Sequence, residues 1–311
     1  MALLLIALSS GVERALGGSV ISAIPVGTFP QALVFTPSNN NVYVANRDSG
    51  TVSVIDGTNN SLIKNITVGS FPGQLLFNPS NNNVYVANVI SNTISVIDGK
   101  TNVVTDEVGV GYDPVDLEYN PTNNNIYVAN QGTKTVSIIN GSNNGVIGEV
   151  EVGSSPISLE FNPSNNRLYV ANLNSGTVSV INTSSNKLEH TIEVGNGPTE
   201  MEFNPSNNDI YVTNRGSRTV SVIDEVNNTL VSNPVVGTEP IDLLFNPSNN
   251  NMYVANIVSN SVSILDSRNN TVIGTVNVNS LPLALEFNPA NNGVYVAGTL
   301  TGTEGLVSVI E

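Results

Sequence analysis

A tyrosine recurs every 42 residues along this chain, at positions 43, 85, 127, 169, 211, 253 and 295. Each copy opens a tetrad that reads Tyr-Val-Ala-Asn or a close variant of it. A fixed period of about 20–50 residues is typical of a chain built from copies of one supersecondary unit. Seven such units account for nearly all of the 311 residues, so we expect one repeat domain and no separate catalytic domain.

Every unit contains four short runs of β-branched and aromatic residues, separated by clusters of Gly, Pro and Asn. In the second unit the runs are Gln74–Phe77, Val84–Asn88, Thr93–Asp98 and Asn102–Val110. Such runs predict strands joined by hairpin turns, and no segment shows the helical period of about 3.6 residues. Strands such as Val42–Ala45 carry apolar or small residues on both faces, which indicates sheets covered on both sides. The pattern predicts an all-β, seven-bladed β-propeller with four antiparallel strands per blade.

The two ends of the repeat array complement each other. Ser19–Val26 aligns with the fourth strand segment Ser61–Val68, whereas the last repeat stops after its third strand segment, Val307–Glu311. We therefore expect the N-terminal strand to complete the last blade and close a propeller that spans residues 19–311, because this hides an open sheet edge. An open solenoid is the alternative architecture, but it needs polar capping repeats and gives no reason for this match.

Charge and composition narrow the classes of partner. The chain has 25 acidic and 10 basic residues, with a net charge of −15, so it repels phosphate backbones and anionic lipid. Cysteine is absent, which excludes disulfides and thiolate metal sites. Residues 1–18 contain the apolar run Ala2–Leu8, which predicts a clipped secretory leader; a disordered start is the alternative. The run is shorter than the roughly 20 apolar residues of a membrane span.

The repeat resembles that of the YVTN-type β-propeller family. The tetrad at 211–214 reads Tyr-Val-Thr-Asn, and the flanking Phe-Asn-Pro-Ser-Asn-Asn and Thr-Val-Ser-Val-Ile-Asp segments match as well, from about residue 19 to the end. The last repeat departs from the pattern, with Gly298 in place of Asn and three extra residues before Val307. The family is known from archaeal surface-layer proteins and from secreted archaeal and bacterial proteins. The resemblance implies an extracellular or cell-surface scaffold, and we expect a monomeric domain whose partner is a protein or another component of the cell envelope.

Two connections in each unit vary from copy to copy, and we expect both on one face of the ring. One precedes the inner strand and the other follows the tetrad. The candidate binding residues in these connections are Phe29, Arg47, Phe71, Val89, Ile90, Tyr112, Leu173, Arg215, Ile257, Val258 and Leu281. Apolar side chains in exposed turns can mark a contact surface. The alternative is that they plug the channel mouth or fold back on the blades.

The inner strands carry a second candidate site. Carboxylates occur two and four residues after the inner-strand proline, at Asp116, Glu118, Glu160, Glu200, Glu202, Asp242 and Glu286. Oxygen ligands suit a hard cation such as Ca²⁺, and converging carboxylates raise the pKa of one another. A water-filled acidic channel without a metal is the favoured interpretation, because a calcium site also needs a fixed ligand geometry.

Catalytic groups are few. The sole histidine, His190, is expected in an outer strand far from the axis, which argues against a His-based triad, a multi-His metal centre and haem ligation. Related seven-bladed folds include lactonases and streptogramin lyases, but the lyases rely on an active-site histidine. We therefore expect a non-catalytic scaffold that needs no cofactor. The alternative is a metal-dependent, lactonase-like hydrolase that uses Glu118, Glu160, Glu200 and Glu202.

Overall fold

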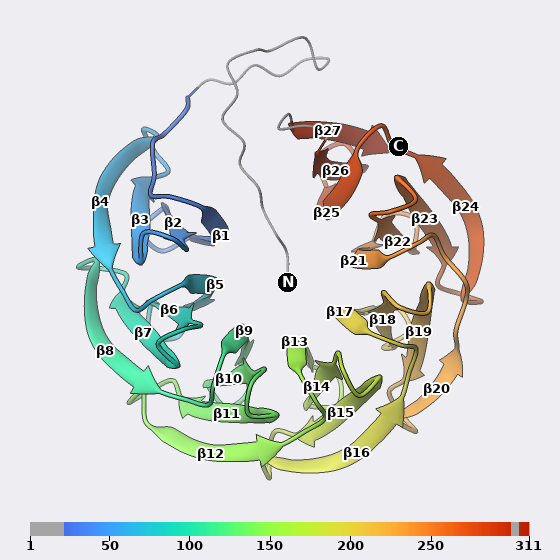
Figure 1. Cartoon of the computed structure of the whole chain (residues 1–311), viewed down its shortest axis with the longest axis horizontal. Helices are drawn as coiled ribbons and strands as arrows, with labels where there is room; N and C mark the ends of the chain where they lie inside the picture. Colours follow the sequence, from blue (N-terminus) through green and yellow to red (C-terminus); the bar gives the residue numbers. More distant parts are fainter. Residues whose placement is uncertain (1–21, 300–304, 311) are drawn as a thin grey trace.

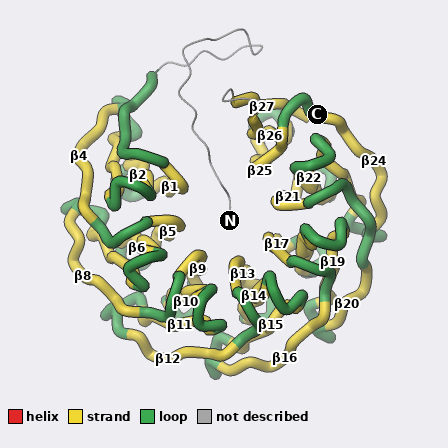
Figure 2. The backbone as a smooth tube through the Cα atoms, in the orientation of Figure 1, coloured by secondary structure: helices red, strands yellow, loops and turns green. Residues whose placement is uncertain are grey.

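The computed structural model describes residues 22–299 and 305–310. They form seven antiparallel sheets around a central axis, which confirms the predicted seven-bladed β-propeller (Figure 1). Within each blade the chain starts next to the axis and moves outward strand by strand, so the inner strands line the channel and the last strands form the rim (Figure 2). The described part of the chain contains strands and turns but no helix.

The strand boundaries repeat from blade to blade. The first four blades contain β1–β4 (Pro30–Thr36, Asn41–Asn46, Thr51–Asp56, Ser61–Thr67), β5–β8 (Pro72–Asn78, Asn83–Asn88, Thr93–Asp98, Val103–Gly109), β9–β12 (Pro114–Asn120, Asn125–Asn130, Thr135–Asn140, Val146–Glu151) and β13–β16 (Pro156–Asn162, Arg167–Asn172, Thr177–Asn182, Lys187–Glu193). The other three contain β17–β20 (Pro198–Phe203, Ile210–Asn214, Thr219–Asp224, Thr229–Ser232), β21–β24 (Pro240–Asn246, Asn251–Asn256, Ser261–Asp266, Thr271–Asn277) and β25–β27 (Leu281–Asn288, Gly293–Thr299, Gly305–Ile310).

Turn residues set where these strands end. In the second blade the Asn78 side chain accepts a hydrogen bond from the backbone N–H of Ser80 over 2.9 Å, and Asn82 has a left-handed φ of 67°. Asparagine tolerates this backbone region better than most residues. Asp98, the last residue of the third strand β7, accepts from the backbone N–H of Lys100 over 2.7 Å. The nearly constant Asn-Pro-Ser-Asn-Asn segments and the aspartate that ends the third strand therefore serve as turn residues. We call the face that carries them the turn face.

The repeating tyrosine ties each of the first five blades to the next. Tyr85 is fully buried, and its hydroxyl donates to Asn144 Oδ1 of the following blade over 2.9 Å. Tyr127 makes the same bond to Asn186 over 3.1 Å. The same step of 59 residues recurs from Tyr43, Tyr169 and Tyr211. A buried phenol needs a hydrogen-bond partner, and here the next blade supplies it.

Six apolar clusters fill the spaces between successive blades. Between the third and fourth blades, Tyr127 and Val136 of one sheet pack with Leu159 and Phe161 of the next. Each blade that has a neighbour on both sides is therefore covered on both faces, which explains why its two central strands have no polar face. Among the described residues, no cluster joins the seventh blade to the first.

The sheet faces at this seventh junction are exposed in the described structure. Leu33 and Phe35 on β1 are 44% and 49% exposed, whereas Leu75, which corresponds to Leu33 in the next blade, is 6% exposed. Val307 and Val309 on β27 are 56% and 50% exposed, although the matching residues of β3 are fully buried. Over the described residues the ring is therefore open between its first and last blades (Figure 1).

The last blade corrects one prediction. Its sheet has three strands, β25–β26–β27, and the expected fourth strand, Ser19–Val26, forms no strand over its described part, residues 22–26. Pro25 stands where Thr67 pairs with Thr51 in the first blade, and proline has no backbone N–H to donate to such a ladder. Residues 19–21 and the predicted leader at 1–18 lie outside the described residues.

Close packing explains the departure at Gly298. In six blades a glycine before the inner strand lies against the Asn that ends the tetrad; a Cβ on Gly153, for example, would lie only 2.6 Å from Asn172 Cγ. The site has room for one side chain. In the last blade the two residue types are exchanged, with Asn279 at the glycine position and Gly298 at the asparagine position. A Cβ on Gly298 would lie 2.5 Å from both Leu281 O and Ser280 Oγ, so this position has no room for a side chain in the last blade.

Candidate functional site

The two variable connections of each blade lie side by side. In the first blade the backbone N–H of Arg47 donates to the carbonyl oxygen of Phe29 over 2.9 Å. In the second blade Val89 N–H donates to Phe71 O over 3.1 Å, and this pairing continues through the sixth blade. Both connections therefore lie on one face, as expected, opposite the turn face. We call it the variable face.

The residue that accepts this bond has a left-handed backbone. The φ angle is 54° at Phe29 and 57° at Phe71. Bulky residues seldom adopt this region, and they are strained in it. The next four blades have Asp113, Ser155, Gly197 and Glu239 at this position. Two phenylalanines on neighbouring blades thus hold a conformation that suits smaller residues better.

The predicted contact residues divide into two groups by exposure. Phe29, Ile90, Tyr112, Arg215, Val258 and Leu281 are exposed, whereas Arg47, Phe71, Val89, Leu173 and Ile257 are half-buried. Tyr112 is 64% exposed and Ile90 is 56% exposed. The variable face therefore presents several large apolar side chains to water, and these do not fold back on the blades.

Two arginines at the same repeat position have different surroundings. Arg47 Cζ lies 5.0 Å from the ring centre of Phe29 and 4.7 Å from that of Phe71, within the range of cation–π interactions. Arg215 instead forms an ion pair with Glu239, with Nε–Oε2 and Nη2–Oε2 distances of 2.9 and 2.5 Å. The charge of Arg215 is neutralised by a carboxylate, whereas that of Arg47 lies between aromatic rings.

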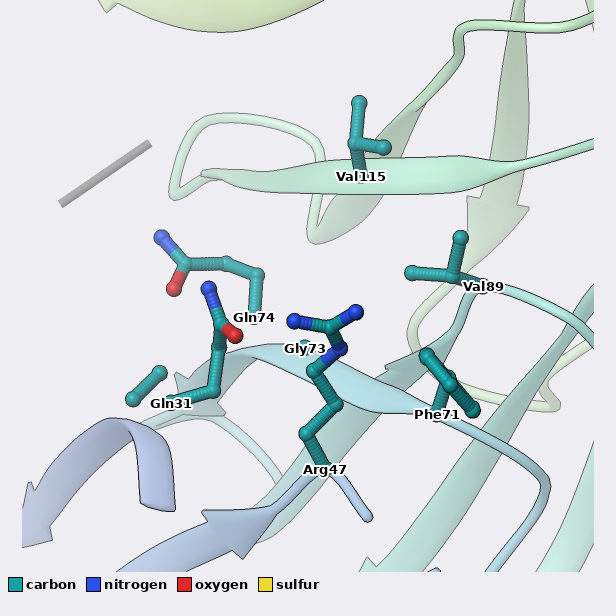
Figure 3. A pocket seen from close by; sticks show the side chains of 8 residues that line it. Gln31, Arg47, Phe71, Gly73, Gln74, Val89 and Val115 are labelled. Carbon is teal, nitrogen blue, oxygen red and sulfur yellow. The ribbon is translucent and has the colours of Figure 1, made fainter. Parts of the chain in front are cut away.

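A pocket of about 230 Å³ opens beside Arg47, between the first two blades (Figure 3). Its lining consists of Gln31, Ala32, Arg47, Phe71, Gly73, Gln74, Val89 and Val115. The sequence predicts Arg47, Phe71 and Val89 as contact residues, but the prediction misses the other five. A signal for two of them exists at the position after the inner-strand proline. That position holds Gln31 and Gly73 in the first two blades and Val115, Ile157, Thr199, Ile241 and Leu283 in the others.

Five of the seven predicted channel carboxylates accept hydrogen bonds from the next blade. The backbone N–H of Leu159 donates to Asp116 Oδ2 over 2.7 Å, and that of Leu285 donates to Asp242 Oδ2 over 2.7 Å. The same bond joins Phe161 to Glu118, Phe203 to Glu160 and Phe245 to Glu202. Donor and acceptor are 43 residues apart each time. These carboxylates therefore satisfy inner-strand amides and connect neighbouring blades.

The other two carboxylates have different surroundings. Glu200 Oε1 accepts from the hydroxyl of Ser158 over 3.4 Å, and Glu286 is exposed. Gln74 extends the acidic set toward the second blade, because its Nε2 donates to Asp116 Oδ1 over 3.4 Å. The channel wall is thus a chain of inter-blade contacts.

Burial raises the pKa of the channel carboxyls. The pKa of Asp116 rises to about 6, those of Glu202 and Asp242 to about 7, and that of Glu118 to about 8. Burial also raises the pKa of Glu160 well above its usual range. Loss of hydration is the main cause, and the charges of neighbouring carboxylates add to it. The channel therefore holds protons near neutral pH.

The described channel residues form no metal-ligand group. Across residues 22–299 and 305–310, no three His, Asp or Glu side chains are placed to share a metal ion. His190 lies in β16, the outer strand of the fourth blade, as expected. No helix in the described ranges has the length and apolar character to cross a membrane.

The fold and these surfaces define a seven-bladed β-propeller with a constant turn face and a variable face. A family model described as a YNCE-like β-propeller matches residues 5–130 of the chain. No curated protein sequence matched it.

Two solved structures share the fold at low sequence identity. The dihydro-heme d1 dehydrogenase NirN, in complex with DHE, has a TM-score of 0.78 and 15% identity over 90% of this chain and 63% of that chain. The hydrazine synthase of Kuenenia stuttgartiensis has a TM-score of 0.69 and 16% identity over 96% of this chain and 99% of that chain. This chain thus spans 63% of the length of the NirN chain. At these identities the likeness concerns the fold alone.

Proposed function

We propose that this protein is a non-catalytic β-propeller scaffold of the YVTN type, located outside the cell or at the cell surface. It binds a protein or another component of the cell envelope through its variable face. The observation that carries the proposal is the exposure of Ile90, Tyr112 and Val258, at 56%, 64% and 54%, on the face where the blades differ. Large apolar side chains in exposed turns can mark a contact surface.

Charge supports a protein or envelope partner. With a net charge of −15 the surface disfavours nucleic acid and anionic lipid. A monomeric propeller satisfies the proposal, because each blade contributes its own pair of variable connections to the same face.

The channel supports a non-catalytic role. A catalytic carboxylate has to reach substrate, but Asp116 and Asp242 each accept a 2.7 Å hydrogen bond from an adjoining inner strand. These bonds satisfy backbone amides of the inner strands, so the acids have a structural task.

The test is retention of the purified protein on isolated cell envelopes of its source. We expect the triple variant Ile90→Ser, Tyr112→Ser, Val258→Ser to lose about tenfold or more of its binding, because the loss of apolar contacts is large at interface centres. Its melting temperature should stay the same, since all three side chains are more than half exposed.

A matched control uses the turn face. Val226 is 79% exposed in the turn between β19 and β20, so Val226→Ser removes an even more exposed apolar group from the opposite side of the ring. This variant should bind like the unmodified protein. If the triple variant and the control bind equally well, the variable face is not the contact surface.

A further inference from the structure

The pocket between the first two blades combines features that differ from the other repeats. We infer that it binds an apolar amino-acid carboxylate, which is a carboxylate with a neighbouring N–H and a small apolar side chain. A free amino acid or the C-terminal residue of a polypeptide presents this chemistry. The inference deepens the proposed function, on which it rests for the role of the variable face.

The space exists because Gly73 has no side chain. A Cβ built on Gly73 would meet Val89 Cγ2 at 3.6 Å and Ala87 O at 3.9 Å, which are ordinary contacts, so a larger residue would fit. The third blade has Val115 at this position. An apolar cavity of roughly 150 Å³ holds benzene, whereas sites for drug-sized ligands measure roughly 300–1,000 Å³. The volume of about 230 Å³ therefore suits a single amino-acid residue.

Gln31 supplies an acceptor without a partner. Its side chain is 8% exposed, and its Oε1 is buried without a hydrogen bond within the described ranges. It lies where the pairing of β1 with β2 shifts between Pro30 and Ala32, and its amide points into the pocket beside Arg47 (Figure 3). An unsatisfied buried acceptor costs about 1–3 kcal/mol. An N–H of the ligand would satisfy it.

Arg47 supplies a cation with free hydrogen-bonding capacity. Phe29 and Phe71 hold the guanidinium between their rings. Its nearest carboxylate in the described structure is Asp48, with Nε and Oδ1 4.0 Å apart, which is longer than a hydrogen bond. A guanidinium binds a carboxylate in planar, charge-assisted geometry. A guanidinium that no carboxylate of the described residues pairs within hydrogen-bond distance favours an anionic ligand over a neutral one at this site.

The rest of the wall has the apolar side chains of Phe71, Val89 and Val115, together with Ala32, Gly73 and Gln74. The amide of Gln74 is already engaged, because its Nε2 donates to Asp116 Oδ1. The ligand must therefore accept a bond from Arg47, donate one to Gln31 and fill an apolar space, all within one residue's length. An amino-acid carboxylate has the three groups at this spacing. Inorganic phosphate has no apolar part, and a neutral sugar has no charge for the guanidinium.

Calorimetric titration of the full chain tests the ligand. The probes are free leucine, N-acetyl-Gly-Gly-Leu, and the same peptide with a C-terminal carboxamide. We expect saturable binding of free leucine, of the acid peptide or of both. The carboxamide peptide should bind at least about tenfold more weakly, because it loses the charge-assisted bond to Arg47. Binding of leucine alone identifies a free amino acid as the source, and binding of the peptide identifies a chain end.

Variants locate the site. Arg47→Gln should weaken binding of the acid probe about tenfold, and Gln31→Leu should weaken it about threefold or more. Gly73→Val should abolish it by filling the space. The matched control is Arg215→Gln, which changes the same repeat position four blades on, where the charge is already paired with Glu239. This control should bind like the unmodified protein, and melting temperatures should be similar for all four.

Three results would overturn the inference. The first is no saturable binding of either acid probe up to about 10 mM, which corresponds to less than about 3 kcal/mol of binding free energy. The second is equal binding of the acid peptide and the carboxamide. The third is that Arg47→Gln and Arg215→Gln change binding equally. The envelope assay uses Ile90, Tyr112 and Val258, none of which lines the pocket. If the probes do not bind in the pocket while the protein still binds envelopes, the proposed ligand is rejected and the proposed function is not.

Discussion

The turn face and the variable face come from the same repeating unit, yet they keep the repeat to different degrees. On the turn face the side chains themselves repeat, as in the bond from Tyr85 to Asn144 and its equivalents in other blades. On the variable face the backbone pairing repeats, but the same position holds Arg47, Val89 or Leu173. The residue type thus repeats where its side chain contacts the next blade. It varies where the backbone alone makes the repeated contact.

The largest expected effect concerns the repeating tyrosine. Tyr127→Ala should lower the free energy of unfolding by about 3–5 kcal/mol, because it leaves a cavity between two blades and removes the bond to Asn186. Tyr112→Ala on the variable face should change it by about 0.5 kcal/mol or less, since that side chain is 64% exposed. Chemical denaturation measures both, and similar losses would break the comparison.

A smaller effect is expected at the glycine that packs against the last residue of the tetrad, beneath the variable face. Gly153→Ala places a Cβ 2.4 Å from Ser175 Oγ and 2.6 Å from Asn172 Cγ, so it should destabilise the fold by about 1–3 kcal/mol. Adding Asn172→Gly should recover part of the loss, because it removes the Asn172 side chain that the new Cβ would meet. A double variant less stable than the single one would show that the exchange needs other changes.

The channel between the two faces should make stability depend on pH. Carboxyl groups titrate near pH 4 in an unfolded chain (about 3.9–4.3), whereas burial raises the folded pKa of Asp242 to about 7 and of Glu118 to about 8. Between these values the folded state binds more protons, so the free energy of unfolding should fall as pH rises from about 4 to about 8.

Melting temperatures from pH 5 to pH 8 measure this effect. The melting temperature should be higher at pH 5, with a free-energy difference of at least about 1 kcal/mol, since one pKa unit corresponds to about 1.4 kcal/mol. Glu118→Gln cannot lose a proton and should reduce the slope. A melting temperature that increases toward pH 8 would contradict the assignment of these acids.

The smallest expected effect sharpens the contrast within one hairpin. Ile90→Ser should change the free energy of unfolding by about 0.5 kcal/mol or less, because Ile90 is 56% exposed. Ile94→Ser, four residues on, should cost several times more, because Ile94 is fully buried between blades. Comparable losses in the two variants would place Ile90 in the core.

Much of the fold is readable from local patterns. The spacing of Tyr43 and its equivalents predicts the number of blades, and the left-handed Asn82 lies in a turn that its sequence predicts. The expected closing strand at Ser19–Val26 is not formed over its described part, because strand pairing depends on a partner and on donors that Pro25 lacks. The candidate contact residues stay a prediction. Gln31 and Gly73 differ from the other repeats at the position after the inner-strand proline, but only the structure places them in one pocket.

The sequence by itself determined the repeating unit, its strands and its turns, because these depend on residues close together in the chain. Tertiary structure decided the partners of the variable side chains. Arg47 lies against the rings of Phe29 and Phe71, whereas Arg215 at the same repeat position pairs with Glu239. The channel acids likewise find their donors 43 residues away. Such contacts depend on how adjacent blades are positioned against each other, which the period of one blade does not specify.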